Sequence, residues 1–260
     1  DSSTSRGLGD VYKRQPPMGP VSIEIPIDIQ RTNIERPSML DQIKLPTINL
    51  QIGDISSVDQ IESIIKTSKR KILWVGNGGK YAKDEVEKFI EMGFAVVTST
   101  LGKGVVPESN KMSFGAFNAV PLIEDFYQTL DLMIVVGSRL RGHETRDMSL
   151  KLPYNIIHID IDPDAEERTY KTNLFHCGDA KKVLGELADR LSNQLSSDDE
   201  WVNEVANLKS KILQDYKNNL GAYKDFPEII RRVLPEDGRW VRDVTISNSC
   251  LLYTSDAADE

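Results

Sequence analysis

Four short runs of β-branched and other apolar residues alternate with amphipathic stretches between residues 71 and 195, and this alternation constrains the fold more than any other feature. Continuous apolar runs are typical of strands buried on both faces, and helices between such strands build a parallel sheet. One helix is predicted to begin near Lys83, and another carries Leu184 and Leu191 on one face. We therefore predict an α/β fold with a central Rossmann-like parallel sheet and helices on both faces. The predicted strands are residues 72–75, 95–98, 132–136 and 156–161.

The residues on either side of this block are expected to belong to incomplete flanking α/β domains. Residues 21–29 alternate apolar and polar side chains, which predicts a short strand whose pairing Pro26 restricts. Ser57 and Gln60 fit the capping-box pattern, which predicts that a helix begins at Ser57. The predicted divisions are residues 16–30 as the end of one domain, 31–54 as a linker, 55–195 as a central domain that folds alone, and 196–249 as linker helices and the start of a further domain with a strand at 240–246.

The two ends of the sequence differ from the rest. Residues 5–15 and 250–260 resemble translations of a transposon adapter used to prepare DNA sequencing libraries, and neither has the apolar periodicity of a helix or strand. We expect residues 1–15 and 250–260 to derive from that adapter, which leaves residues 16–249 as the biological segment. The alternative is a pair of ordinary tails.

Composition argues against several classes of function. The formal net charge of −8 disfavours broad contact with nucleic acid, which requires a basic face. No stretch approaches the roughly 20 apolar residues that span a bilayer, so we expect no membrane association and a cytoplasmic location. Two cysteines are too few for a disulfide framework, and the three histidines lack the spacing of zinc ligands. Cys177 is expected to be an inert buried thiol.

A glycine-rich turn follows the first predicted strand. Gly76, Gly78 and Gly79 precede a helix, where a ligand phosphate can approach backbone N–H groups. A tight turn without a ligand explains these glycines equally well. Tyr81 occupies the position of the third glycine in a dinucleotide-binding fingerprint, and this argues against an ordinary NAD dehydrogenase.

Charged side chains follow the third and fourth predicted strands. Arg139 and Arg141 are candidates to grip a phosphate or carboxylate, with a solvated loop as the alternative. His158, Asp160 and Asp162 lie on one side of a strand by their period of two, which superficially suggests a metal site. We favour instead a carboxylate, at Asp160 or Asp162, that accepts a hydrogen bond from a ribose or a neighbouring loop.

Taken in order, the segments resemble thiamine diphosphate enzymes of the acetolactate synthase type. Residues 19–30 look like the closing strand of that family's pyrimidine-binding domain, and residues 234–244 look like the entry to its diphosphate-binding domain. The block between them is similar to the family's middle domain throughout. The resembling segments of that block are Leu-Trp-Val-Gly-Asn-Gly-Gly at 73–79, Thr-Ser-Thr-Leu-Gly-Lys-Gly at 98–104, Val-Gly-Ser-Arg at 136–139, His-Ile-Asp-Ile-Asp at 158–162 and Gly-Asp at 178–179.

This resemblance implies a decarboxylase or carboligase that binds thiamine diphosphate and Mg²⁺ at a dimer interface. It also implies a small-molecule 2-oxo acid as substrate and a homo-oligomer, either a dimer or a tetramer. The family's activating glutamate would precede residue 19, and its Gly-Asp-Gly to Asn-Asn magnesium motif would follow residue 249. The resemblance thus assigns no catalytic residue and no metal ligand to this chain, which we expect to be inactive by itself.

In acetolactate synthases the middle domain also holds FAD, and the resemblance places the corresponding contacts on five loops of this chain. One loop departs from the pattern, because those enzymes continue Phe-Asp-Asp-Arg after Gly-x-Arg and this chain has Leu-Arg-Gly-His-Glu at 140–144. This difference favours a 2-oxo acid decarboxylase relative whose middle domain is empty or holds an ADP-like group instead of FAD. A nucleotide-binding α/β module without catalytic domains is the alternative. The implied contacts are Gly76, Gly78, Gly79, Thr100, Leu101, Gly137, Arg139, Asp160, Asp162, Gly178 and Asp179.

Overall fold

The computed structural model describes residues 16–20, 22, 24–42 and 50–235. The chain divides into an amino-terminal unit, residues 1–50, and a larger unit, residues 51–260. The described part of the amino-terminal unit contains a short helix, α2 (Ile27–Gln30), and a 3₁₀ turn, η1 (Ser38–Gln42), neither of which buries a residue. The strand predicted at 21–29 is therefore wrong at its carboxyl end. A strand needs a neighbour to pair its backbone, and the described residues of this unit contain none, so the amide of Gln30 bonds back to the carbonyl of Pro26 at 3.1 Å.

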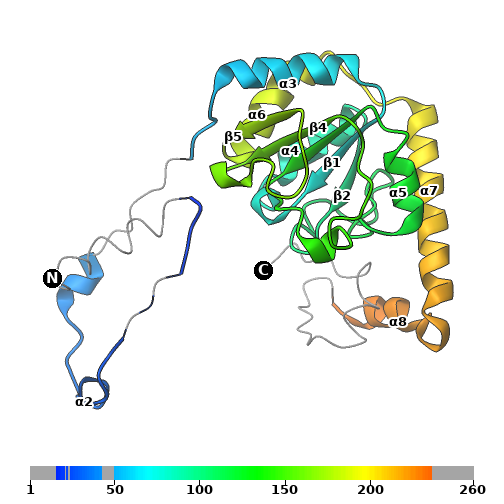
Figure 1. Cartoon of the computed structure of the whole chain (residues 1–260). Helices are drawn as coiled ribbons and strands as arrows, with labels where there is room; N and C mark the ends of the chain where they lie inside the picture. Colours follow the sequence, from blue (N-terminus) through cyan, green and yellow to red (C-terminus); the bar gives the residue numbers. More distant parts are fainter. Residues whose placement is uncertain (1–15, 21, 23, 43–49, 236–260) are drawn as a thin grey trace. The chain divides into compact units, whose positions relative to one another are not determined.

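The larger unit is built around a five-stranded parallel sheet with the order β2-β1-β3-β4-β5 (Figure 1). Every residue in the first four strands is buried, as their apolar runs predict, and the α/β fold class is confirmed. Leu73 of the central strand pairs with Val96 on one side and Ile134 on the other. The strands are β1 (Lys71–Val75), β2 (Phe94–Thr98), β3 (Leu132–Val136), β4 (Ile156–Asp160) and β5 (Leu174–Cys177).

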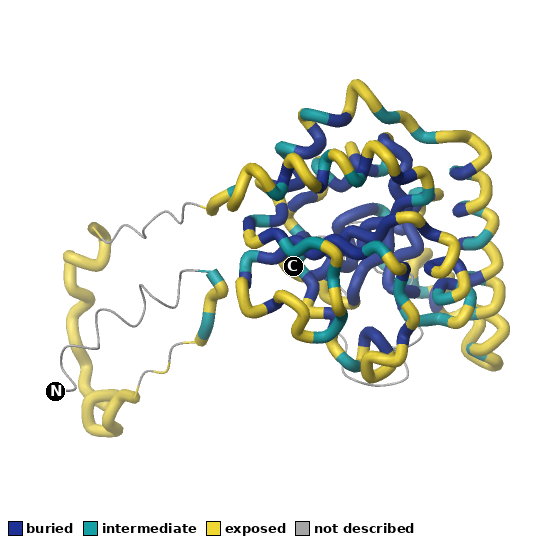
Figure 2. Tube along the Cα trace, turned by 45° about the horizontal axis from the view of Figure 1, so that its top comes forward, coloured by how far each residue is buried: buried dark blue, intermediate teal, exposed yellow. Residues whose placement is uncertain are grey.

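Helices cover both faces of the sheet, and the buried residues concentrate in and against it (Figure 2). Successive strand residues point to opposite faces, so Leu73 joins one apolar cluster and Trp74 the other. The first cluster is completed by α3 (Ile55–Thr67), α4 (Lys83–Glu91) and α6 (Ala180–Leu191), and the second by α5 (Pro121–Tyr127) and α7 (Asp199–Asn219). None of the helices within the described ranges has both the length and the apolar character to cross a membrane.

The core extends beyond Leu195, because α7 packs its apolar side against the sheet. Trp201 is buried, its ring stacks on Phe126 with centroids 5.5 Å apart, and its indole N–H donates to the carbonyl of Gly93 at 2.8 Å. Val205 and Ile212 continue the same buried side one and three turns later. A 3₁₀ turn, η5 (Gly221–Tyr223), and a short helix, α8 (Phe226–Val233), follow. The strand predicted at 240–246 lies outside the described residues.

Helix α3 begins two residues before the predicted capping box. Asp54 is the N-cap residue, and its carboxylate accepts the amide of Ser56 at 3.0 Å. The hydroxyl of Ser57 donates to the carbonyl of Asp54 at 2.8 Å and lies 2.5 Å from Nδ1 of the buried His176 on β5. The predicted start at Ser57 was therefore wrong, because Asp54 caps the helix and the Ser57 hydroxyl is engaged by these two contacts.

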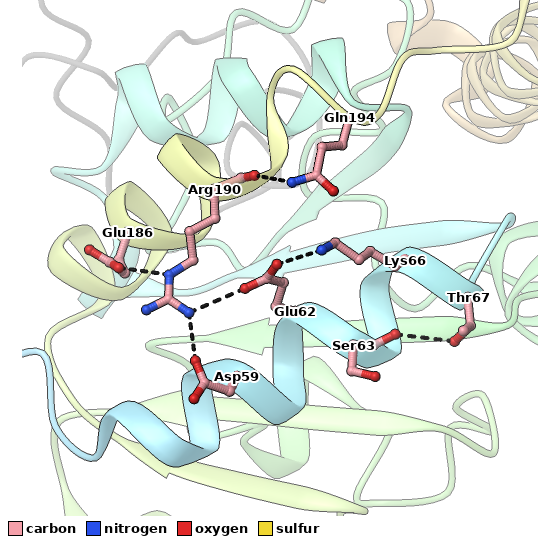
Figure 3. Close-up of polar contacts among 8 residues, drawn as sticks. All are labelled: Asp59, Glu62, Ser63, Lys66, Thr67, Glu186, Arg190 and Gln194. Atoms are coloured by element: carbon pink, nitrogen blue, oxygen red, sulfur yellow. Dashed lines mark hydrogen bonds and ion pairs between the residues drawn. The ribbon is translucent and has the colours of Figure 1, made fainter.

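Ion pairs join α3 to α6 across the outside of the first layer (Figure 3). The Arg190 guanidinium lies 2.6 Å from the carboxylate of Asp59, 3.2 Å from that of Glu62 and 2.7 Å from that of Glu186. Lys66 extends the network by pairing with Glu62 at 2.6 Å. These pairs orient the two helices over the sheet from outside the core.

Candidate functional site

The carboxyl ends of the five parallel strands meet at one edge of the sheet, and all eleven residues predicted to contact a cofactor lie on strand ends or loops at that edge. In the order β2-β1-β3-β4-β5, the chain leaves β1 toward β2 on one side and returns to β3 on the other. Ligands of open parallel sheets bind beyond the strand ends near such a reversal. The structure thus brings the sequence-predicted residues to the edge at which this fold holds ligands.

The loops after β1 and β3 touch each other through glycines. The amide of Gly78 donates to the carbonyl of Gly137 at 2.9 Å, and a Cβ on Gly76 would lie 2.4 Å from the same oxygen. Gly137 also has a φ of +55°, the left-handed region that favours glycine. The contact between the two loops therefore accounts for these glycines, and the 3₁₀ turn η2 (Asn77–Gly79) stands between β1 and α4. Gly78 remains exposed, whereas Gly76 and Gly79 are buried.

Buried charged side chains, which the sequence did not single out as functional, support the loop after β2. Thr100 and Leu101 are exposed at its tip. Behind them, Lys103 and Glu108 form a buried ion pair at 3.0 Å. Lys209 on α7 donates to the carbonyls of Glu108 and Asn110, and its burial lowers the pKa of its amine. A lysine a hundred residues away carries no local signal of this role.

The loops after β3 and β4 carry the charged candidates. Asp162 accepts the amide of Asp164 at 3.0 Å, and its other oxygen lies 3.9 Å from Arg139 and 3.5 Å from Arg168. Asp160 is buried and accepts the amide of Asp162 at 2.9 Å, which is a bond within its own loop. The expected hydrogen bond to one of these acids from a ribose or a neighbouring loop stays a prediction. Arg168 was not identified from the sequence.

His158 lies beneath this loop. Its Nε2 is 3.0 Å from the carbonyl of Ser138 and 3.8 Å from the carboxylate of Asp160, and burial lowers the pKa of the imidazole. Within the described ranges, no group of three or more His, Cys, Asp and Glu side chains is arranged to hold a metal ion.

The turn after β5 has a structural explanation as well. Asp179 is the N-cap of α6 and accepts the amide of Lys182 at 3.0 Å. Gly178 makes room for the segment that enters the unit, because a Cβ there would lie 2.5 Å from the carbonyl oxygen of Ile52.

Cys177 is exposed, so the prediction of a buried thiol was wrong: a position at the end of an edge strand leaves its side chain uncovered. Partial burial and the nearby Asp160 and Asp162 raise its pKa.

A cavity of about 280 Å³ opens beside Thr100. Its polar side chains include Asn118, whose amide donates to the carbonyl of Glu144 at 2.7 Å. Glu144 is buried, and desolvation raises the pKa of its carboxyl group. The neighbouring loop holds several non-glycine residues at positive φ, namely Leu140, Arg146, Asp147 and Met148. The remaining lining residues are Ala116, Phe117, Ala119, Val120, His143 and Tyr216.

Comparison with known proteins identifies the fold's family. The profile described as "Thiamine pyrophosphate enzyme, central domain" matches residues 58–187, which is half of the chain. The chain belongs to this family. The matched residues run from the first turn of α3 to the last turn of α6 and include all five strands of the thiamine pyrophosphate enzyme central domain described above.

Three similar proteins are named as acetolactate synthases. The chain is 29% identical over 218 residues to the acetolactate synthase large subunit of Corynebacterium glutamicum, covering 78% of this chain and 34% of that protein. It is 25% identical over 255 residues to the probable acetolactate synthase large subunit of Methanococcus aeolicus, covering 91% and 42%. Against chloroplastic acetolactate synthase 3 of Brassica napus it is 27% identical, covering 76% and 32%. The chain thus spans about a third of the length of the relatives it matches.

Proposed function

We propose that this chain is the central-domain part of a thiamine diphosphate- and Mg²⁺-dependent enzyme that decarboxylates a small 2-oxo acid or joins the product to a second carbonyl compound. The match of the central-domain profile to residues 58–187 carries this proposal. The similarity to acetolactate synthase large subunits supports it. On this reading the working protein is a homo-oligomer, a dimer or tetramer, and its catalytic groups lie in the parts of such an enzyme that flank the central domain.

The chain's own contribution is a rigid platform with a nucleotide-like site at the carboxyl edge. Thiamine diphosphate, when bound, supplies the electron sink that allows a 2-oxo acid to lose carbon dioxide. No residue described above is proposed to hold it or Mg²⁺, so the 260-residue chain is expected to show no activity alone. Figure 1 shows the sheet enclosed by helices, an arrangement that suits a fixed spacer between flanking domains.

At the carboxyl edge we propose an ADP-like group in preference to FAD. Four of the eleven sequence-predicted contacts are exposed, namely Gly78, Thr100, Leu101 and Arg139, and they provide a backbone turn, an apolar contact and a cation. The sequence-predicted contacts that are buried would contribute by fixing the conformation of the loops that carry the exposed ones. The loop after Arg139 departs from the family pattern and places the buried Glu144 in the wall of the cavity beside Thr100.

A non-catalytic nucleotide-binding module is the second candidate. Its support is that both faces of the sheet are covered by helices from the same unit, so the fold completes its core without flanking domains. The two proposals differ in what adjoins residues 16 and 249 in the source gene.

A long sequencing read of the source DNA across both junctions tests the proposal. We expect the frame to continue into an upstream domain with an activating glutamate and a downstream domain with the Gly-Asp-Gly to Asn-Asn motif. A frame that reads straight through the present ends without either motif would overturn the enzyme proposal and leave the binding module.

A further inference from the structure

The imidazole of His176 on β5 contacts both the segment that enters the larger unit and the first turn of α3. Its Nε2 lies 2.5 Å from the carbonyl oxygen of Ile52, and its Nδ1 lies 2.5 Å from the hydroxyl oxygen of Ser57. The residue is buried, with 1% exposed. A carbonyl oxygen accepts and never donates, so Nε2 carries a hydrogen in either charge state of the ring. The charge of the ring is therefore decided at Nδ1.

The Ser57 hydroxyl has one hydrogen for two contacts. Its oxygen lies 2.8 Å from the carbonyl oxygen of Asp54 as well as 2.5 Å from Nδ1. When the ring is neutral, Nδ1 is an acceptor, so the hydroxyl donates either to Nδ1 or to Asp54 and one contact is lost. When the ring is protonated, Nδ1 donates to the hydroxyl oxygen and the hydroxyl donates to Asp54. The imidazolium therefore satisfies the contacts to Ile52, Ser57 and Asp54 together.

The charges on the elements around His176 also favour the imidazolium. Hydrogen bonds from Ser56 lower the pKa of the Asp54 carboxyl, and the charge of a protonated His176 lowers it further. Burial opposes a charge, but the cost falls when the charged group is paired and hydrogen-bonded. The charged groups at the neighbouring ends of these elements are the acids Asp54 at the cap of α3, Asp160 of β4 and Asp179 at the cap of α6, and the exposed cations Lys181 and Lys182 of α6.

The contacts of His176 lie where residues 51–54 meet the end of β5. The amide of Asp179 donates to the carbonyl of Gln51 at 2.9 Å. Gly53 has a φ of +85°, and a Cβ there would overlap the carbonyl oxygen of Cys177. The two backbones are thus in direct contact, and the imidazole bonds across the same contact.

We propose that His176 is a proton-operated clasp that holds residues 51–54 to the carboxyl end of β5. The protonated ring closes the clasp through Ile52 and Ser57, and loss of the proton from Nδ1 loosens it. Because the folded chain then holds this proton more tightly than the unfolded chain, the stabilisation is present at low pH and is lost as the pH rises. This role does not depend on the function proposed above.

Nitrogen-15 NMR of the imidazole and amide hydrogen exchange test the clasp in the 260-residue chain, between about pH 5.5 and pH 8, the range in which histidine titrates. Both ring nitrogens of His176 should carry a proton at the acidic end, and Nε2 alone at the basic end. The amide of Asp179, corrected for intrinsic exchange, should be about tenfold less protected at the basic end, the factor expected for one hydrogen bond. The amide of Gly76, which donates to Val136 at 2.8 Å, is the internal reference for opening of the whole sheet. Burial raises the pKa of the Cys177 thiol, so the thiol stays neutral over this range.

Three substitutions separate the proton from the packing. His176→Gln keeps an N–H donor but carries no titratable proton, so protection of the Asp179 amide should no longer depend on pH. Ser57→Ala removes the acceptor of the protonated Nδ1 and should reduce the pH dependence to about threefold or less. His143→Gln removes an imidazole that is 66% exposed and is the matched control, which should leave the pH dependence intact.

An imidazole of His176 that stays neutral at the acidic end would overturn the clasp. So would protection of the Asp179 amide that is independent of pH in the parent chain, or a pH dependence that persists in His176→Gln. Thermal melts verify that each variant folds. If His176→Gln does not melt cooperatively, the ring nitrogens of the parent chain and the response of Ser57→Ala decide the question.

Discussion

Replacement of Trp201 tests whether α7 is part of the folded core. Trp201 is 7% exposed and combines three contacts: stacking on Phe126, an indole bond to Gly93, and the Arg70 guanidinium 4.7 Å from the ring centroid. A tryptophan buries about 200 Å², which at about 25 cal/mol/Å² gives an upper value of about 5 kcal/mol. Truncation of large aromatic side chains in cores costs about 3–5 kcal/mol. We expect Trp201→Ala to lower the free energy of unfolding by about 4 kcal/mol.

Urea denaturation followed by far-UV circular dichroism measures this loss. With a slope of about 2 kcal/mol per molar urea, the midpoint of Trp201→Ala should fall by about 2 M. Trp201→Phe keeps an aromatic ring but loses part of the buried indole and its hydrogen bond to Gly93, so it should cost about 1–2 kcal/mol, less than Trp201→Ala. Asn207→Ala, on the exposed side of α7, is the matched control and should leave the midpoint in place. A loss below about 1 kcal/mol for Trp201→Ala would refute the packing of α7 against the sheet. The folded core would then end at Leu195, as the sequence predicts.

Three further predictions concern the loops, the surface and pH. Gly137→Ala should cost at least about 2 kcal/mol in urea denaturation, because a Cβ at φ +55° would also lie 2.5 Å from the Cα of Gly78. Gly221→Ala has the same φ with nothing within 4 Å and should cost about 1 kcal/mol or less; equal losses would contradict the loop contact. Arg190→Ala should cost about 1 kcal/mol at low salt and less in high salt, and a salt-independent loss would argue against its ion pairs. Burial lowers the pKa of His158 below its ordinary value of 6.5, so the unfolded chain takes up a proton that the folded chain excludes; stability should fall as the pH drops below 6.5, and His158→Gln should flatten that slope in urea titrations at several pH values.

Periodicity predicted those parts of the fold that depend on local patterns. Four strands were predicted because runs such as residues 132–136 are continuously apolar and β-branched. Strand β5 was missed because Leu174–Cys177 is short, lies at the edge of the sheet and includes a histidine. Helix α5 was missed because seven residues hold too few turns to show a period. The cap of α3 was misplaced because Asp54, also a preferred N-cap residue, accepts the amide of Ser56, while the hydroxyl of Ser57 contacts His176, which is 119 residues away in sequence.

The position of the candidate site was predictable from the sequence, but most of the contacts within it were not. The common edge was predictable, because the carboxyl ends of parallel strands must meet there. The partners at that edge were not: Arg168 reaches Asp162 only through the turn at Glu167, and Lys209 reaches the loop after β2 only because α7 packs on the sheet. The glycine-rich turn does not by itself indicate a ligand, because Gly78 and Gly137 approach each other too closely to leave room for a Cβ at either position.

The release of carbon dioxide from 2-oxo acids by the protein that the source gene encodes tests the central claim most directly. Pyruvate and 2-oxobutyrate are suitable first substrates, assayed with and without thiamine diphosphate and Mg²⁺. The account predicts release that requires both additions, and none from the 260-residue chain under the same conditions. Absence of release from the complete protein with every 2-oxo acid tried, while ADP still binds, would contradict it and favour the nucleotide-binding module.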